Sequence, residues 1–227
     1  MGAIYLVRHA QASFGHGDYD RLSALGERQS VRLGEALTTR EVKPDVVVAG
    51  AMQRHARTAS IALETAGLPS EVAVDEGFNE FDHDQVIVAY KPAYKRRAVL
   101  LADLARTGHP TRAFQEMFGE ATERWTRSDG DGYSESFADF AGRSEDAVRR
   151  TAARLGKGET AVVFTSGGPI AAVVSRLLSG GDDLWLKLNP VTINTGITKL
   201  VSGRSGLTLI SFNDHAHLDG TDLLSYR

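Results

Sequence analysis

Three short, largely apolar runs, each followed by polar residues, stand out along the chain. Residues 3–7 (AIYLV), 45–49 (DVVVA) and 160–165 (TAVVFT) have the length and composition of strands that are buried on both faces. Each run ends abruptly, and the first leads into a polar, glycine-containing loop that includes FGHGDYD. The pattern predicts buried strands with functional loops at their ends.

Helical periodicity follows each of these runs. Ser23 is available as an N-cap, and the spacing after it predicts a helix to about Thr39. The segment QRHARTASIALETAG predicts a second helix closed by Gly67, and SGGPIAAVVSRLLSGG predicts a third that ends at Gly180. The positions that define the first helix are Leu22, Leu25, Gln29, Leu33 and Leu37.

Strands that alternate with helices predict an α/β fold with a mostly parallel sheet and helices on both faces. Two further strands are expected near 192–201 and 207–212. Between 84 and 157 no β-like run occurs, and stretches such as AVLLADLAR and FADFAGRSEDAVRRTAARL are helical in period. We therefore expect one domain over 1–227 with a mainly helical lid inserted at 84–157.

Composition narrows the functional classes. The 227 residues are 42% hydrophobic, carry a formal net charge of -3 and include no cysteine. These values give no electrostatic reason to expect nucleic acid or a membrane surface as partner, and they exclude disulfides and thiolate chemistry. The N-terminal apolar run stops at Arg8, too early for a signal peptide, so a cytoplasmic location is expected.

Chemically active side chains follow the predicted strands. Arg8 and His9 come after the first, Arg54 after the second, Glu80 soon after EVAVDEGF, and the segment SGG at 166–168 after TAVVFT. The carboxyl ends of parallel strands meet at one edge of a sheet, where ligands bind. An imidazole nucleophile, guanidinium groups that neutralise phosphate oxygens and a carboxylate proton donor indicate phosphoryl transfer without a metal or cofactor.

Several ordered motifs resemble one family. LVRHAQAS, DRLSALGERQSVRLGEAL, VVVAGAMQRHARTASIAL, FNEFDHD, VVFTSGGPIAAVV and INTGITKL followed by FNDHAHL are together similar to the histidine phosphatase superfamily, the phosphoglycerate-mutase-like proteins. The resemblance implies a Rossmann-like three-layer fold and two-step transfer through phosphohistidine. It also implies that His9 is the nucleophile, that Arg8 and Arg54 bind phosphate, and that Glu80 is the acid-base residue.

One position departs from the family pattern. Where these proteins usually have a second histidine before two glycines, this chain has Ser166, followed by Gly167. A hydroxyl can donate a hydrogen bond to a phosphoryl oxygen but brings no charge. As candidates to replace the ring we weigh the histidines 55, 215 and 217. If the missing ring limits the rate, Ser166→His is expected to raise it.

Other assignments stay open at this point. Gln11 and Ser13 follow the nucleophile and can donate to phosphate, although polar residues are ordinary in such a loop. Glu80 competes with Glu76, Asp82 and Asp84 for the acid-base role. FDHD resembles a metal-binding run, but ligands so close in sequence usually point apart. The remaining alternatives are a substrate role or a solvated face for KPAYKRR, and lid packing or a substrate box for Trp125, Tyr133, Phe137 and Phe140.

The sequence therefore predicts a metal-independent phosphatase that hydrolyses a small phosphomonoester through phosphohistidine on His9. A catalytically weak member that binds a phosphorylated ligand is the alternative that Ser166 suggests. A phosphoglycerate-type mutase is the other, although its substrate-binding lid segments are not recognisable in 84–157. Neither the substrate nor the oligomeric state follows from the sequence.

Overall fold

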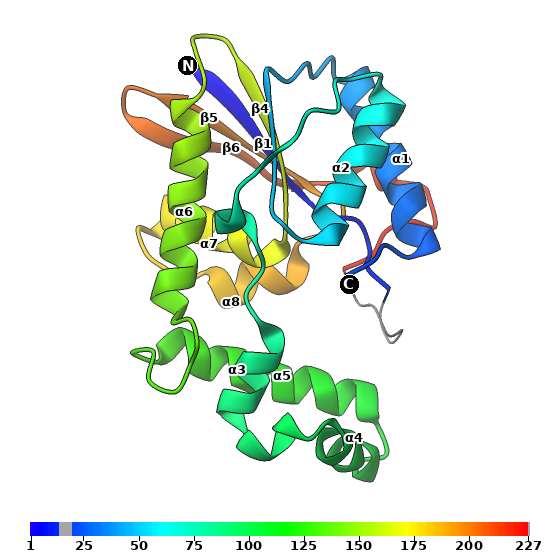
Figure 1. The fold of residues 1–227 in the computed structure, drawn as a ribbon, viewed down its shortest axis with the longest axis vertical. Coiled ribbons are helices and arrows are strands. Elements are labelled where there is room, and N and C mark those ends of the chain that lie inside the picture. The colour runs from blue at the N-terminus through cyan, green and yellow to red at the C-terminus, as the bar shows by residue number, and fades with distance from the viewer. Residues whose placement is uncertain (14–19, 227) are drawn as a thin grey trace. The chain divides into compact units, whose positions relative to one another are not determined.

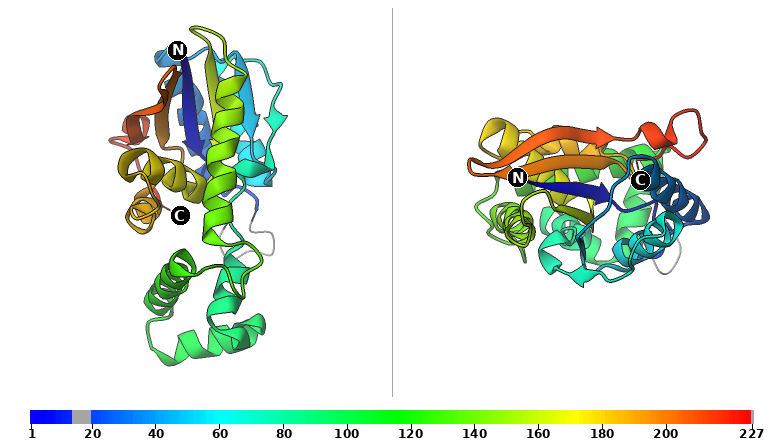
Figure 2. Two further views of the ribbon diagram at one scale, coloured as in Figure 1. Left: turned by 90° about the vertical axis from the view of Figure 1, so that its left-hand side faces the viewer. Right: turned by 90° about the horizontal axis from the view of Figure 1, so that it is seen from above.

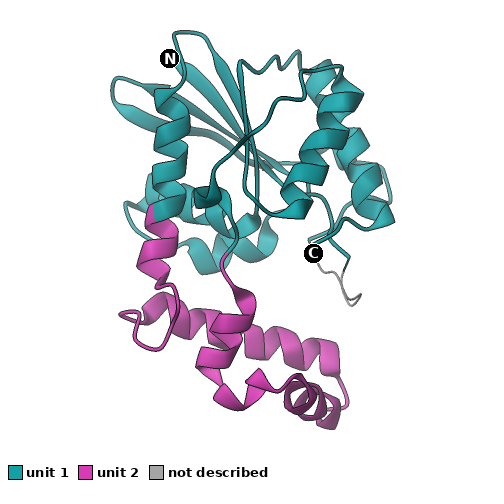
Figure 3. Ribbon diagram, viewed as in Figure 1, with its two compact units in different colours: residues 1–80, 143–227 teal, residues 81–142 magenta. Residues whose placement is uncertain are grey.

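The chain folds into two compact units, which are coloured separately in Figure 3. The computed structural model describes residues 1–13 and 20–226. The first unit comprises Met1–Glu80 and Arg143–Arg227, and the second comprises Phe81–Gly142. Residues 143–157, which fall in the segment expected to form a lid, thus belong to the first unit.

A six-stranded sheet in the order β3-β2-β4-β1-β5-β6 is the centre of the first unit (Figure 1). Neighbouring strands among the first four in that order run parallel, whereas β5 is antiparallel to β1 and β6 is antiparallel to β5. The fold is α/β with a mostly parallel sheet, as the alternation of strands and helices predicts. The strands are β1 (Gly2–Arg8), β2 (Val46–Ala49), β3 (Ala73–Val74), β4 (Thr160–Thr165), β5 (Ile197–Gly203) and β6 (Gly206–Asp214).

Helices cover both faces of this sheet (Figure 2). On one face Leu33 of α1 (Ala24–Thr39) and Leu63 of α2 (Gln53–Ala66) pack with Val7 and Phe164 of the strands. On the other face, side chains of α6 (Phe137–Ala153) and α7 (Gly167–Ser179) pack with Ile4 and Val163. Strand side chains alternate between the two cores, since successive residues point to opposite faces. The result is a three-layer unit.

The helix ends predicted from the sequence are confirmed. Ser23 is the N-cap of α1, and its hydroxyl accepts a hydrogen bond from the Gly26 N–H. Gly67 and Gly180 end α2 and α7 in the left-handed conformation, at φ values of 64° and 74°. At their other ends, α2 and α7 begin a few residues after β2 and directly after β4.

The strand expected near 192–201 begins later than predicted, at Ile197. Residues 189–191 form a short 3-10 helix (η3, Asn189–Val191), and Thr195 has a φ of 59°. A β-branched residue in the left-handed region cannot continue a strand. The apolar character of this segment therefore comes from a buried turn, in which Ile193 and Asn194 are 2% and 0% exposed.

The second unit is helical. It contains η2 and part of α6, and the aromatic rings of Phe81, Trp125 and Phe140 form its core, with centroids 4.6 to 5.5 Å apart. Trp125 also lies edge-on to Phe137, which supports packing as the role of these rings. No helix in the described ranges has the length and apolar character needed to cross a membrane. The helices confined to this unit are α3 (His83–Tyr90), α4 (Arg97–Arg106) and α5 (Pro110–Arg127), with η2 at Pro92–Lys95.

Candidate active site

His9 lies directly after β1 and is 6% exposed. Its Nδ1 is 2.7 Å from the Ala10 carbonyl oxygen, an acceptor that requires the proton to be on Nδ1. The other ring nitrogen, Nε2, accepts a hydrogen bond of 3.2 Å from Arg54 Nε. The ring therefore presents an unprotonated Nε2, the form in which imidazole is a nucleophile.

The backbone around His9 is held from three directions. Its N–H donates to the Thr165 carbonyl at 2.8 Å, and the Asn194 amide donates to its carbonyl at 3.0 Å. The next N–H, that of Ala10, donates to the Thr58 hydroxyl at 3.0 Å. These bonds come from three separate segments of the chain, so the fold fixes the position of His9.

The pKa of His9 is well below the usual value of a histidine. Burial is the main cause, and the positive charges of Arg54 and Arg8 act in the same direction. The ring is therefore neutral at physiological pH. This is the protonation state that attack on phosphorus requires.

Arg54 sits in the first turn of α2 and is 5% exposed. Its Nη1 forms an ion pair of 2.8 Å with Asp20, whose carboxylate also accepts from the Gln53 N–H at 2.7 Å. Asp20 thus caps α2 and orients the guanidinium at once. The Arg54 Nε contact to His9 places a positive charge next to the His9 ring.

Arg8 is anchored by the last part of the chain. Its Nη1 donates to the carbonyl oxygens of Thr192 and Tyr226, the latter at 2.9 Å. A Cβ added to Gly167 would lie 3.5 Å from Arg8 Nε. The Arg8 guanidinium therefore reaches the N-terminal end of α7. Its positive charge also helps to lower the pKa of His9.

Glu80 lies two residues after the short helix η1 (Glu76–Phe78), beyond the end of β3. Its Oε2 accepts a hydrogen bond of 3.1 Å from the Gly168 N–H in the first turn of α7. Asp82 instead caps α3 by accepting from the Gln85 N–H, and the acid-base role of Glu80 stays a prediction.

Ser166 and the first turn of α7 complete the set at the ends of the parallel strands. Ser166 is fully buried, and its Oγ lies 2.7 Å from Nε2 of His55. The His55 ring is in turn 5.6 Å from the ring of His9, centroid to centroid. Two imidazoles, two guanidiniums and the N-terminus of α7 thus gather where β1, β2 and β4 end.

Comparison with known proteins assigns this arrangement to a family. A sequence model of the histidine phosphatase superfamily (branch 1) matches residues 4–91 and 104–215, which is well over half of the chain. The chain belongs to the histidine phosphatase superfamily. Members act on phosphorylated small molecules, and both phosphatases and mutases have this architecture.

Curated relatives in the superfamily match only a segment. Phosphoglycerate mutase 1 of Saccharomyces cerevisiae is 39% identical over 72 residues, which are 29% of this chain and 29% of that protein. A 2,3-bisphosphoglycerate-dependent phosphoglycerate mutase of Thermobifida fusca is 39% identical over 75 residues, 30% of each chain. The chain thus matches less than a third of the length of these relatives.

Solved structures of the superfamily share the fold over nearly the whole chain. Mycobacterial glucosyl-3-phosphoglycerate phosphatase has a TM-score of 0.64 at 24% identity and covers 94% of this chain and 99% of its own. Phosphoserine phosphatase of Entamoeba histolytica, in complex with 3-phosphoglyceric acid, scores 0.65 at 19% identity, with coverages of 96% and 100%. Phosphoglycerate mutase of Bacillus anthracis scores 0.64 at 16%, with coverages of 95% and 94%.

The side chains of Gln11 and Ser13 form hydrogen bonds with residues just before α1. The Gln11 Oε1 accepts from the Ser23 hydroxyl at 2.8 Å, and the Ser13 hydroxyl donates to the Leu22 carbonyl at 3.1 Å. Both bonds tie the loop after His9 to the start of α1. Contact of these two residues with phosphate stays a prediction, and residues 14–19 of the expected loop lie outside the described residues.

Of the three histidines weighed as replacements for the family's second ring, His55 is the one in contact with His9 and Ser166. His217 Nε2 lies 3.1 Å from the Thr195 hydroxyl, and His215 Nδ1 lies 2.7 Å from the Asn213 carbonyl. Among the described residues no three His, Cys, Asp or Glu side chains gather in a way that could hold a metal, and His83 of FDHD packs edge-on against Phe81 at 4.3 Å.

Sequence reasoning missed the residues that hold the reactive groups in place. Asp20 orients Arg54, Thr58 supports Ala10, and Asn194 holds the His9 carbonyl. Asp20 and Asn194 lie in loops, where a polar residue is ordinary. Thr58 is a polar residue on the buried side of a helix, and that signal was present in the sequence.

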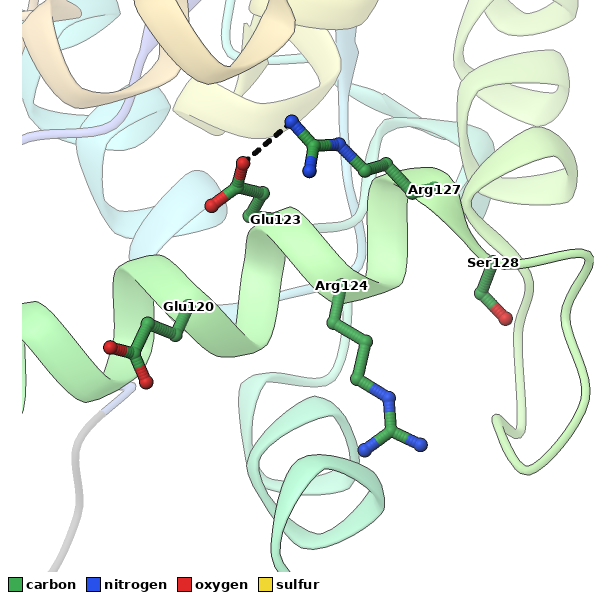
Figure 4. Close-up of a pocket in the computed structure, with 5 residues that line it drawn as sticks. All are labelled: Glu120, Glu123, Arg124, Arg127 and Ser128. Carbon is green, nitrogen blue, oxygen red and sulfur yellow. Dashed lines mark ion pairs between the residues drawn. The ribbon is translucent and has the colours of Figure 1, made fainter.

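A separate surface hollow lies on the second unit (Figure 4). It is lined by Glu120, Glu123, Arg124, Arg127 and Ser128, and Glu123 and Arg127 form an ion pair of 2.6 Å across one turn of α5. Exposed pairs of this kind contribute about 0.3 to 0.5 kcal/mol to a helix. None of the residues predicted for phosphoryl transfer lines it, and it carries no functional assignment.

Proposed function

We propose that this chain is a metal-independent phosphatase that transfers the phosphoryl group of a small phosphomonoester to His9 and then to water. The observation that carries the proposal is the state of His9: buried, neutral, with Nδ1 hydrogen-bonded to Ala10 and Nε2 beside Arg54. A site of this kind supplies the nucleophile and the charge that a phosphoryl group needs.

In the first step the Nε2 lone pair attacks phosphorus and forms an N–P bond while the bond from phosphorus to the ester oxygen breaks. Glu80 enters this step as the carboxylic acid and gives its proton to the departing oxygen, which leaves as an alcohol. The Arg54 N–H that contacts Nε2 in the free protein turns to a phosphoryl oxygen as the N–P bond replaces its acceptor. Charge on the transferred group is then met by guanidinium donors.

In the second step water attacks the phosphorus of phosphohistidine. Glu80, now a carboxylate, takes a proton from that water, the O–P bond forms and the N–P bond breaks. Inorganic phosphate leaves and Nε2 regains its lone pair, so the cycle closes without an external reagent. The Ala10 carbonyl keeps the Nδ1 proton in place throughout, which fixes the nitrogen that reacts.

The N-terminus of α7 contributes to anion binding in this proposal. Gly167 and Gly168 expose backbone N–H groups there, and the Gly168 N–H contacts Glu80 in the free protein. Helix N-termini favour negative charge because their N–H groups have no partner within the helix. A side chain at 167 would approach Asn189 Oδ1 to 3.1 Å, so glycine leaves room for the anion and for Arg8.

Hydrolysis is the proposed outcome, and the structures that share the fold include phosphatases of phosphoserine and glucosyl-3-phosphoglycerate beside mutases. The test is incubation with p-nitrophenyl phosphate and a panel of phosphometabolites in EDTA, beside His9→Ala. Phosphate release that falls by more than about 10³-fold in the variant is expected. Turnover that survives in His9→Ala, or that EDTA abolishes, would contradict the proposal.

Ser166 favours one competing function, the binding of a phosphorylated ligand without turnover. The uncharged hydroxyl stands at the end of β4, where a cation would contribute to the rate. Under that alternative the protein binds the phosphometabolite panel in calorimetry and releases no phosphate. Phosphate release that depends on His9 decides for the enzyme.

A further inference from the structure

Gln29 carries a fully buried amide on α1, and the steps above do not use it. Leu33 and Leu37, which follow at helical spacing on the same buried side, are apolar. Burying an amide costs free energy unless its donor and acceptor groups are hydrogen-bonded. A glutamine at such a position therefore calls for an explanation in terms of what it binds.

Both ends of the Gln29 amide are hydrogen-bonded. Its Oε1 accepts from the Gln11 N–H at 2.8 Å. Its Nε2 donates to the Leu223 carbonyl oxygen at 2.6 Å and to the Ser225 hydroxyl at 2.8 Å. A backbone N–H can only donate and a carbonyl oxygen can only accept, so these partners fix which end of the amide is which.

The acceptor end of Gln29 acts on the nucleophile through one peptide group. The Gln11 N–H belongs to the same peptide as the Ala10 carbonyl, which accepts the Nδ1 proton of His9. A hydrogen bond to the N–H of a peptide polarises it and makes its carbonyl a better acceptor. Gln29 thus both fixes and strengthens the acceptor that holds the His9 ring.

The donor end of Gln29 joins a second route to His9. The Ser225 hydroxyl donates to Asn194 Oδ1 at 2.9 Å, and Asn194 Nδ2 donates to the His9 carbonyl at 3.0 Å. Asn194 is also fully buried, and its N–H donates to the Ser225 carbonyl at 3.0 Å. One side chain therefore connects the bonds that hold the backbone of His9 with the bond that holds its ring proton.

We propose that Gln29 is a positioning residue for the nucleophile: through the peptide between residues 10 and 11 it holds the carbonyl that keeps the proton on Nδ1 of His9 and leaves Nε2 unprotonated. This role rests on the function proposed above. It matters most after attack, because Nε2 is then bonded to phosphorus and the ring carries positive charge. The one remaining ring N–H donates to the Ala10 carbonyl, and a better acceptor there stabilises the charged ring.

The ring proton of His9 in the free protein tests this role without turnover. Long-range proton–nitrogen NMR spectra of protein labelled at its seven histidines would show which ring nitrogen is protonated, and the His9 signal is the one that His9→Ala removes. Gln29→Met keeps the length of the side chain and offers at most a weak acceptor. We expect the Nδ1 proton of His9 to exchange with water about 10-fold faster in this variant.

Kinetics measure the same change during the reaction. Gln29→Met is expected to lower kcat and the rate of phosphohistidine formation about 10-fold, with KM nearly unchanged, because the phosphate-binding arginines are not altered. Ser30→Ala is the matched control. Ser30 is fully buried on the same helix and donates to the Gly26 carbonyl at 2.8 Å, and we expect its variant to behave as the wild type in both measurements.

Gln29→Glu separates positioning from packing. A buried carboxyl is neutral, so its carbonyl oxygen can accept from the Gln11 N–H and its O–H can donate to the Leu223 carbonyl. We expect Gln29→Glu to recover most of the slow proton exchange and most of the rate that Gln29→Met loses. Equal losses in both variants, at wild-type unfolding temperature, would overturn the proposal.

The outcomes separate this role from the proposed function. If the wild-type His9 ring is protonated on Nε2, both fall. If the chain releases no phosphate, the proposed function falls, and the exchange rates still show whether Gln29 holds the ring proton. If exchange and rate in Gln29→Met match the wild type, only the role of Gln29 falls. Should Gln29→Met lose its fold, Gln29→Glu decides, because a folded variant without the slow exchange and the rate would overturn the proposal.

Discussion

Two buried imidazoles, both neutral, lie side by side at the centre of this site. His9 and His55 are 6% and 0% exposed, and burial is the largest cause of the low pKa of each. The positive charge of Arg54, in the first turn of α2, lowers both pKa values further. A positively charged imidazole here would be desolvated beside a guanidinium, so the positive charge of the site lies on arginine and both imidazoles are neutral.

Gly50 is the residue that makes room for the second ring. A Cβ added at this position would lie 2.3 Å from His55 Nδ1 and 2.9 Å from Asn79 Oδ1, both of which are closer than real contacts. Gly50→Ala is expected to lower the free energy of unfolding by about 1 to 3 kcal/mol, because neither neighbour can move without losing its contacts. It should also lower phosphatase activity, since His55 and the Asn79 loop both shift.

Denaturant unfolding of Gly50→Ala beside Gly119→Ala measures this effect. Gly119 lies on α5 with nothing within 4 Å of the added Cβ, so its replacement is expected to stabilise the helix by about 0.5 to 1 kcal/mol. Equal changes in the two variants would show that the space next to His55 is not limiting.

Ser166→His tests the same crowding from the opposite side. The Ser166 Oγ already lies 2.7 Å from His55 Nε2 in a fully buried position, so a second ring has no space. We expect lower rate and lower stability, by about 1 to 3 kcal/mol, rather than the gain that the sequence alone suggested. The double variant His55→Ala/Ser166→His, in which the ring moves from α2 to the end of β4, should recover activity, as phosphate release and thermal unfolding would show.

At the scale of elements, α6 holds the segment that leads to Glu80. The Arg143 guanidinium donates to the carbonyls of Gly77 and Asn79 at 3.1 and 2.8 Å, and Arg150 pairs with Asp75 at 2.8 Å. Gly77 fits closely against α6, where a Cβ would lie 2.8 Å from that of Ala147. The position of the carboxylate is therefore set by a helix far away in sequence.

Arg143→Met is expected to lower kcat about 10-fold with little change in KM, because the loop before Glu80 loses its anchor while the phosphate-binding arginines stay. Steady-state kinetics on the best substrate of the panel measure it. Arg149→Met is the matched control, on the same helix but exposed and paired with Glu145 one turn away. A fall in both variants alike, or in KM alone, would argue against an anchoring role.

Much of this architecture could be predicted from the sequence because it depends on local pattern. Ser23, Gly67 and Gly180 mark helix ends through their own chemistry, and β4 begins and ends at the residues expected. The turn before β5 was not predicted, since Thr195 adopts its positive φ only where Asn194 and its neighbours bond to other segments. The His55 contact with Ser166 joins residues 111 positions apart, and a contact over that distance cannot be predicted from the local pattern of the sequence.

At the scale of the whole molecule, buried histidines link folding to pH. The pKa of His55 is lowered to about 3 and that of His217 to about 4, in each case mainly by burial, and the pKa of His9 is also well below its usual value. The unfolded chain binds these protons near pH 6.5 and the folded chain does not. These histidines therefore leave the free energy of unfolding undiminished above about pH 6.5. They lower it progressively as the pH falls below that value.

Urea unfolding between pH 7 and pH 5 should show this loss, with a limiting slope of about 1.4 kcal/mol per pH unit for each such histidine. His55→Gln removes one of these histidines and is expected to reduce the limiting slope by the contribution of one histidine, about 1.4 kcal/mol per pH unit. A free energy of unfolding that is flat over this range, or that rises as the pH falls, would mean that these rings are not buried in the neutral form.

The most direct test of the account is to trap the covalent intermediate. The protein is mixed with a phosphoryl donor, quenched in base and analysed by phosphorus NMR and by mass spectrometry of its peptides. The account predicts an acid-labile phosphoramidate on Nε2 of His9, at no more than one per chain, absent from His9→Ala and accumulating in Glu80→Gln. Phosphate on another residue, or steady hydrolysis with no phosphohistidine detected in the wild type or in Glu80→Gln, would contradict it.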